Sequence, residues 1–170
     1  NHQSQFDILA FYGAWRRQFR WVMKHELRSA PGLGWGCAAV GHIFIDRSNR
    51  ERAIESLRAA APLLAGGVSV MFFPEGTRSR DGELAEFKRG GAEVMLSTAD
   101  QLDVVPVAID GSWRLLINNL FPVPFGTRIR ARFGDPIPRE PGDAAAVAAS
   151  AESWIRRTIA EWRHPGPSVS

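Results

Sequence analysis

The chain has 170 residues, which suits a single domain, and it is 45% hydrophobic and 23% charged, as globular proteins with a buried core usually are. The formal net charge is +3, and every basic residue except Lys24 and Lys88 is an arginine. Arginine suits phosphate or carboxylate recognition, although genome composition can produce the same bias. A single cysteine, Cys37, excludes an internal disulfide framework and a cysteine-based metal cluster, and no apolar run approaches the ~18 residues that span a bilayer.

Five short segments predict β-strands. They are residues 19–23, 42–46, 68–73, 104–109 and 128–133. The third, VSVMFF, is apolar except for Ser69 and follows a Gly66-Gly67 turn, and the fifth alternates strictly between polar and apolar positions. Pro106 lies inside the fourth, so we expect an edge, a bulge or a break in the ladder there.

Helical patterns lie between these strands, at residues 6–15, 50–65, 90–99 and 144–162. Asn49 can cap the second helix, and Pro62 is expected to kink or shorten its end. Alternation of helices with apolar strands predicts an α/β fold, in which helices flank a mostly parallel central sheet. We assign residues 1–163 to one domain and residues 164–170 to a disordered tail.

The first seven residues, NHQSQFD, raise two interpretations. Ser4 followed by Asp7 resembles a capping box, which would start a helix and leave His2 incidental. Alternatively, His2 and Asp7 form a catalytic pair. Five positions along one straight helix rotate ~140° net, so the two side chains meet only if His2 lies in the loop before the helix and Asp7 in its first turn. Ser4 as N-cap provides that geometry, so the two interpretations are compatible.

Polar residues directly after predicted strands are the candidate binding residues, because sites in open α/β sheets lie beyond the carboxyl ends of strands. They are Lys24, Arg47 and the run Glu75-Gly76-Thr77-Arg78, which follows the third strand. Gly76 allows close backbone approach to a ligand, and Arg78 can bind a phosphate or carboxylate through two parallel N–H groups. A turn with a surface ion pair is the plainer alternative.

Four blocks resemble, in order, the motifs of the glycerolipid acyltransferase family, and in particular of the 1-acylglycerol-3-phosphate (lysophosphatidate) acyltransferases. They are Asn-His-x4-Asp at residues 1–7, KHELRSAPGLGWGCAAVGHIFIDR at residues 24–47, FPEGTRS with the following FKRGGA at residues 73–92, and VVPVAI at residues 104–109. The resemblance covers about residues 1–137. It implies a glycerolphosphate-acyltransferase-like α/β fold, in which a first strand and a membrane-associating segment precede the position of Asn1.

The resemblance also implies an activity. A fatty acyl group passes from an acyl thioester, either acyl-CoA or acyl carrier protein, to the sn-2 hydroxyl of lysophosphatidic acid, which yields phosphatidic acid. His2 is then the general base, and Asp7 fixes its tautomer. The acceptor-binding candidates are Lys24, Arg47, Glu75, Gly76, Thr77 and Arg78. A thiolate leaves readily, so we expect no covalent intermediate. No carboxylate or histidine cluster has the spacing of zinc ligands, so we expect no metal, and we expect no cofactor. Glycerol 3-phosphate or another lysolipid as acceptor, or a non-catalytic lipid-binding fragment, are the alternatives.

Residues 15–28, WRRQFRWVMKHELR, interleave aromatic and basic side chains. Both lipid interfaces and nucleic acids are bound by such mixtures, and no nucleic-acid motif accompanies this one. We therefore expect this segment to dock on a membrane surface, at the cytoplasmic face, with an ordinary folded surface as the alternative. Non-catalytic roles are expected for His25, His42, His164, Cys37 and the alternating Arg128, Arg130 and Arg132.

Overall fold

A computed structural model describes residues 1–4, 6–15, 17–46, 49–79, 81–98, 102–116 and 124–164. Its central sheet has three parallel strands, in which β1 (Phe19–Lys24) lies between β2 (Ile43–Ile45) and β3 (Ser69–Met71). A second sheet pairs β4 (Val107–Asp110) with β5 (Arg130–Phe133) in antiparallel register. The parallel register brings the carboxyl ends of β1, β2 and β3 to one edge.

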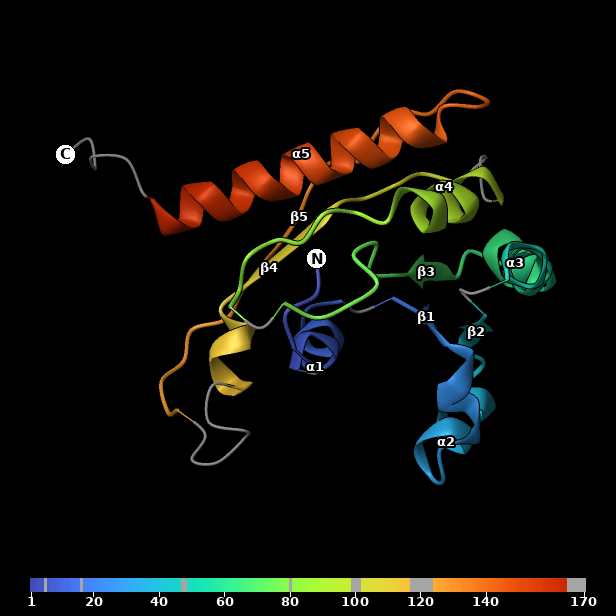
Figure 1. Cartoon of the computed structure of the whole chain (residues 1–170), viewed down its shortest axis with the longest axis horizontal. Helices are drawn as coiled ribbons and strands as arrows, with labels where there is room; N and C mark the ends of the chain where they lie inside the picture. Colours follow the sequence, from blue (N-terminus) through green and yellow to red (C-terminus); the bar gives the residue numbers. More distant parts are fainter. Residues whose placement is uncertain are drawn as a thin grey trace.

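Helices cover both sides of these strands (Figure 1). The α-helices are α1 (Phe6–Ala14), α2 (Leu33–Val40), α3 (Arg50–Ala65), α4 (Arg89–Thr98) and α5 (Ala144–Arg163), and two short 3-10 helices are η1 (His25–Ser29) and η2 (Ser112–Leu116). In Figure 1, α4 and α5 lie on one side of the strands and α1 and α2 on the other. Among the described helices, none has both the length and the apolar character needed to cross a membrane.

The α/β architecture with a parallel sheet and flanking helices confirms the prediction from sequence, with one refinement at Pro106. The strand predicted over residues 104–109 is interrupted there. Val104 forms an isolated antiparallel bridge with Ile137, the Pro106 carbonyl accepts a hydrogen bond from Gly134 N–H at 2.9 Å, and β4 begins only at Val107. The proline has no N–H to donate, so the ladder breaks where it stands.

Two helices differ from expectation. Asn49 Oδ1 accepts a hydrogen bond from Arg52 N–H at 3.0 Å, which confirms the predicted cap, but α3 continues past Pro62 to Ala65. A proline near a helix end removes only one hydrogen bond, so the helix is not shortened. Helix α2 was not predicted, because its glycines disfavour helix. Tertiary packing supports it: a Cβ at Gly34 would overlap the carbonyl oxygen of Arg28 in η1.

The core also corrects one functional expectation. Phe19 and Trp21 pack with Phe11 and are 7% and 4% exposed, so these aromatic side chains of β1 cannot contact a lipid surface. Alternate positions of a strand covered by a helix point into the core, and Phe11 of α1 covers them here. Docking of residues 15–28 through these rings is therefore wrong.

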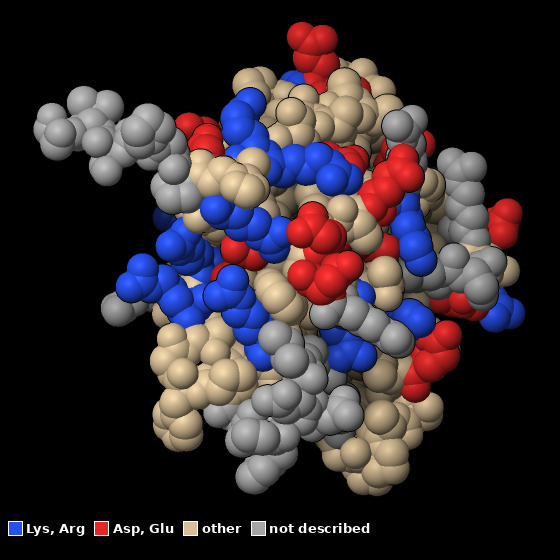
Figure 2. Space-filling model, turned by 60° about the vertical axis from the view of Figure 1, so that its left-hand side comes forward, with Lys and Arg blue, Asp and Glu red and all other residues tan. Residues whose placement is uncertain are grey.

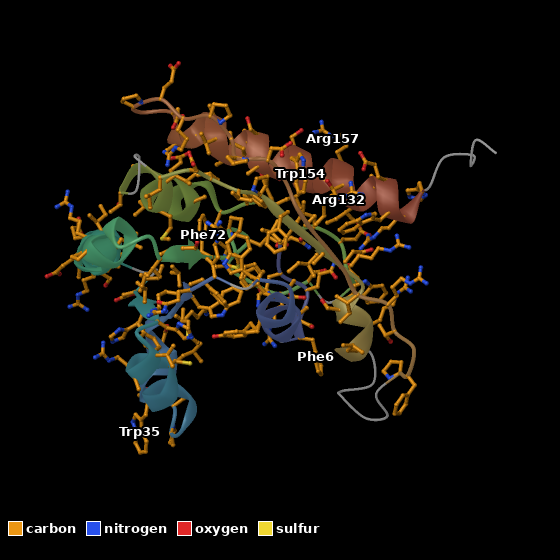
Figure 3. The ribbon with its side chains drawn as sticks, turned by 180° about the vertical axis from the view of Figure 1, so that it is seen from behind. Phe6, Trp35, Phe72, Arg132, Trp154 and Arg157 are labelled. Atoms are coloured by element: carbon orange, nitrogen blue, oxygen red, sulfur yellow. The ribbon has the colours of Figure 1, made fainter. Side chains whose placement is uncertain are left out.

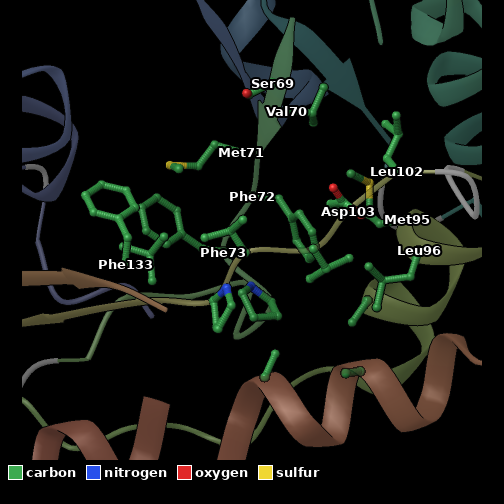
Figure 4. Close-up of a pocket in the computed structure, with 18 of the residues that line it drawn as sticks. Ser69, Val70, Met71, Phe72, Phe73, Met95, Leu96, Leu102, Asp103 and Phe133 are labelled. Atoms are coloured by element: carbon green, nitrogen blue, oxygen red, sulfur yellow. The ribbon is translucent and has the colours of Figure 1, made fainter. Parts of the chain in front are cut away.

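An apolar cavity of about 360 Å³ separates β3 from the segment that leads into β4. Figure 4 shows Phe72, Met95 and Leu96 among the side chains around it. Asn1 lies on its boundary. Within the described residues, β3 and β4 share no strand pairing across this space. The first strand implied by the family resemblance stays a prediction.

Candidate active site

The loop before α1 brings His2 and Asp7 together. Phe6 N–H donates to Ser4 Oγ at 3.0 Å, so Ser4 caps the helix, and Asp7 lies in its first turn. Asp7 Oδ2 accepts from Ser4 N–H at 2.9 Å, which completes the predicted capping box. His2 Nδ1 lies 2.8 Å from the same oxygen. The structure therefore has the loop-and-first-turn geometry that the spacing required.

Four donors surround the Asp7 carboxylate, which is fully buried. Its Oδ2 also accepts from Gln3 N–H at 2.6 Å, and its Oδ1 accepts from the Ser112 hydroxyl. Burial by itself would raise the pKa of Asp7. The hydrogen bonds from His2, Ser112, Ser4 and Gln3 outweigh burial, so that its pKa is lowered below the ordinary value. Asp7 is thus ionised at neutral pH, and it favours the His2 tautomer that carries its proton on Nδ1 and leaves Nε2 as an acceptor.

The segment 73–79 contacts the ring, the backbone N–H and the backbone C=O of His2. The imidazole stacks on the Phe73 ring, with centroids 3.9 Å apart and planes inclined by 11°. His2 N–H donates to Glu75 Oε1 at 2.6 Å, and His2 C=O accepts from Ser79 N–H at 3.0 Å. The FPEGTRS motif therefore holds both the ring and the backbone of His2.

Glu75, a candidate from sequence for shaping the acceptor pocket, is held by backbone N–H groups. Its side chain is buried, and its second oxygen accepts from Ala85 N–H at 3.0 Å. Burial raises the pKa of Glu75 above its ordinary value. Because both oxygens bind backbone N–H groups, Glu75 shapes the site by joining His2 to the segment around Ala85.

Asn1 anchors the other side of the loop. Its side-chain amide pairs with both backbone groups of Ile109 in β4: Nδ2 donates to the carbonyl at 2.8 Å, and Oδ1 accepts from the N–H at 2.7 Å. This pairing is the one that a neighbouring strand would make, and it ties the residue before His2 to the second sheet.

Gln3 and Ser112 complete the buried network. Gln3 Oε1 accepts from Gly111 N–H at 3.0 Å, and its Nε2 donates to Asp110 Oδ1 at 3.2 Å. Gly111 has φ of +97°, and a Cβ there would overlap the carbonyl oxygen of Arg128, so only glycine fits the turn that places Ser112 beneath Asp7. Sequence reasoning did not identify Asn1, Gln3 or Ser112 as site residues. Polar residues on both sides of a histidine, and a Gly-Ser pair at a strand end, were the available signals.

Two of the predicted cations lie at the sheet edge. Lys24 ends β1, and Arg78 belongs to the turn after β3, so parallel pairing brings their backbones to the same edge. Both are exposed and, in the part of the chain that the structure describes, neither forms an ion pair. Gly76, two residues before Arg78, has φ of +68°, which a side chain would strain, and Thr77 is exposed. Arg47 lies outside the described residues.

The structure also places the histidines and the cysteine for which non-catalytic roles are expected. His42 Nδ1 accepts from Trp21 N–H at 3.3 Å, and burial, with nearby Arg20, lowers the pKa of His42. His25 is exposed, and Cys37 is half-buried in α2 and not part of the core. Among the described residues, no three His, Cys, Asp or Glu side chains gather closely enough to hold a metal ion.

Residues 1–110 match the model of the Acyltransferase family. The chain belongs to the acyltransferase family. The chain is 36% identical over 116 residues to a 1-acyl-sn-glycerol-3-phosphate acyltransferase of Chlamydomonas reinhardtii, and the alignment covers 68% of this chain and 34% of that protein. It is 32% identical over 181 residues to the 1-acyl-sn-glycerol-3-phosphate acyltransferase of Pseudomonas aeruginosa, and this alignment covers 99% of this chain and 68% of that protein.

A crystal structure of the 1-acyl-sn-glycerophosphate (LPA) acyltransferase PlsC from Thermotoga maritima has a similar fold. The TM-score is 0.69 and the identity 27%, over 96% of this chain and 64% of that chain. The family and the fold class expected from the sequence are therefore confirmed. The chain spans about a third of the length of the relatives from Chlamydomonas reinhardtii, Arabidopsis thaliana and Brassica napus that it matches.

Proposed function

We propose that this domain transfers a fatty acyl group from an acyl thioester, acyl-CoA or acyl carrier protein, to the sn-2 hydroxyl of 1-acylglycerol 3-phosphate, which gives phosphatidic acid. Relatives named for this acceptor support the substrate. The observation that carries the proposal is the 2.8 Å hydrogen bond between His2 Nδ1 and the buried Asp7 carboxylate. It leaves Nε2 available to a substrate hydroxyl.

In the proposed reaction, His2 Nε2 takes the proton of the acceptor hydroxyl while its oxygen attacks the thioester carbonyl. The carbon–sulfur bond then breaks, and the imidazolium returns the proton to the leaving thiolate. Asp7 stabilises the imidazolium between these steps, because its carboxylate is ionised and hydrogen-bonded to Nδ1. The stacked Phe73 ring holds the imidazole plane, so little reorientation is needed before proton transfer.

Lys24 and Arg78 are proposed to bind the acceptor phosphate. Both are exposed at the carboxyl edge of the parallel sheet, and neither is neutralised by a carboxylate of the described chain. Ser79, the residue after Arg78, donates to the His2 carbonyl, so the Arg78 backbone lies close to the proposed base. Gly76 and Thr77 offer backbone and hydroxyl groups in the same turn, and Arg47 remains a candidate from sequence.

We also propose that the domain docks on the cytoplasmic face of a membrane through η1 and α2. Helix α2 carries no charged residue, and Trp35 is 70% exposed. Figure 3 shows Trp35 pointing away from the body of the molecule. Leu27 and Val40 add exposed apolar surface, and Arg28 supplies a positive charge to face anionic lipid. A single cysteine suits the reducing compartment on that side.

The activity is tested by turnover of lysophosphatidate with acyl-CoA, comparing the parent with His2→Gln at equal folded fraction. We expect kcat to fall at least about 100-fold, in the range for loss of a general base.

Arg78→Ala is expected to raise KM for lysophosphatidate with little change in kcat. Arg157→Ala, which removes an exposed arginine of α5, serves as its control. Equal turnover in parent and His2→Gln contradicts the general-base role. Faster turnover of glycerol 3-phosphate contradicts the acceptor.

Flotation with vesicles tests the docking surface. The parent is expected to float with phosphatidylglycerol vesicles more than with phosphatidylcholine vesicles, and Trp35→Ala is expected to reduce the bound fraction. Phe125→Ala removes a fully exposed aromatic ring outside η1 and α2 and serves as the control. Equal flotation of the parent and Trp35→Ala rules out this surface.

A further inference from the structure

An arginine-rich groove lies at the end of the molecule where η2, the start of β5 and the end of α5 meet. Its volume is about 430 Å³. We call it the arginine groove, and its basic and aromatic lining residues are Arg114, Arg128, Arg130, Arg163, Trp113 and Trp162. Figure 2, in which the left-hand side of Figure 1 is turned forward, shows basic side chains gathered on this face.

Most of this positive charge is uncompensated. Arg163 is neutralised, because its guanidinium pairs with Asp110 at 2.8 Å and with Glu83 at 2.7 Å. Arg114, Arg128 and Arg130 have no ion pair with any carboxylate of the described residues. Like charges gathered without partners repel one another, so the groove is electrostatically prepared for an anion.

The groove is also held in shape. Arg130 Nη1 donates to the Trp162 carbonyl at 2.9 Å, and the Arg114 guanidinium lies 5.5 Å from the centroid of the Trp113 ring. Trp113 packs closely on Gly82, where a Cβ would overlap its indole. Arginine forks bind phosphate through parallel N–H groups, and indole faces stack on planar rings. The lining therefore combines phosphate donors with two indoles that each have a guanidinium over the ring: Arg114 over Trp113, and Arg132, 5.3 Å from the centroid, over Trp162.

The arginine groove adjoins the network beneath the His2–Asp7 pair. Asp110 and Gly111 line the groove, and both are hydrogen-bonded to Gln3. The next residue, Ser112, donates to Asp7. The turn at the end of β4 thus serves the groove on one side and the candidate active site on the other.

We infer that the arginine groove binds the phosphorylated adenine nucleotide of an acyl-CoA donor. This inference rests on the proposed function. The 3′-phosphate and diphosphate of such a donor match the uncompensated arginines, and its adenine matches the flat guanidinium and indole groups stacked in the lining. The acceptor phosphate does not need this groove, because Lys24 and Arg78 lie at the edge of the parallel sheet. The pantetheine arm then carries the thioester from the groove to His2.

Calorimetric titration of the whole chain with adenosine 3′,5′-bisphosphate tests binding independently of turnover. The parent is expected to bind it, and Arg114→Ala/Arg128→Ala is expected to bind at least about tenfold more weakly, as loss of charged hydrogen bonds predicts. Both side chains are exposed, so the double variant should unfold at the parent's temperature. Arg157→Ala, which removes an equally exposed arginine outside the groove, should bind like the parent. Equal affinity in the parent and the double variant overturns the inference.

Kinetics with two donors separates the nucleotide from the rest of the substrate. For acyl-CoA, the double variant is expected to raise KM about tenfold and to leave kcat within about twofold. For an acyl-pantetheine thioester, which lacks the nucleotide, KM and kcat should match the parent. An equal rise in KM for acyl-CoA and for the acyl-pantetheine thioester overturns the inference. With acyl carrier protein as a third donor, a rise in KM confined to that donor overturns it as well. If no thioester turns over while the bisphosphate still binds in the groove, the proposed function fails and the nucleotide site stands.

Discussion

Glu75→Gln is the sharpest test of how the FPEGTR motif works. Glu75 accepts one backbone N–H from His2 at 2.6 Å and another from Ala85 at 3.0 Å, and it is only 1% exposed. Glutamine keeps one acceptor oxygen and turns an amide N–H₂ toward the other backbone donor. One charge-assisted hydrogen bond is lost, and a buried donor is left without a partner. We expect the free energy of unfolding to fall by about 2–3 kcal/mol.

Urea unfolding with an unchanged m-value measures this loss, and Glu86→Gln, an exposed carboxylate of the same segment, serves as control. Kinetics are measured well below the midpoint of unfolding. Because Glu75 positions the backbone of His2, kcat should fall about tenfold or more, while KM for lysophosphatidate stays within about twofold. A raised KM together with parental stability would show instead that Glu75 contacts the acceptor, and the positioning role would have to be abandoned.

Three further predictions follow from single contacts. Ser112→Ala removes a hydrogen-bond donor to Asp7, which makes that carboxylate a stronger partner for the His2 imidazolium. The acid limb of the pH profile of kcat/KM should therefore move to higher pH. An unmoved acid limb would show that Ser112 does not tune Asp7. Burial lowers the pKa of His42, so the unfolded chain binds a proton more readily than the folded chain. The contribution of His42 to the free energy of unfolding is therefore fully present above the ordinary pKa of about 6.5 and is lost as pH falls through the lowered pKa. Unfolding of His42→Gln, followed against pH, should show less of this decline. Gly34→Ala should destabilise by about 1–3 kcal/mol through overlap with η1, whereas Gly36→Ala, with open space around it, should not lower the melting temperature.

Local chemistry determined much of the candidate site. The Ser4–Asp7 capping box depends only on neighbouring residues, and once α1 begins there, Asp7 lies within reach of His2. The apolar runs also predicted where β1 and β3 end, so the amino-acid pattern alone placed Lys24 and Arg78 at the carboxyl edge of the parallel sheet. These features follow from contacts a few residues apart, which a sequence displays directly.

Contacts between distant segments decided the rest. Glu75 turns inward because the His2 and Ala85 N–H groups converge on it, and Ser112 reaches Asp7 across 105 positions of chain. Packing buries Trp21, which alternation with basic residues had suggested for a lipid surface, and it leaves Trp35 exposed instead. The residue types alone therefore determined the chemistry available to this protein. Only the tertiary structure decided which groups are buried, paired or free, because burial and pairing depend on what the fold brings alongside.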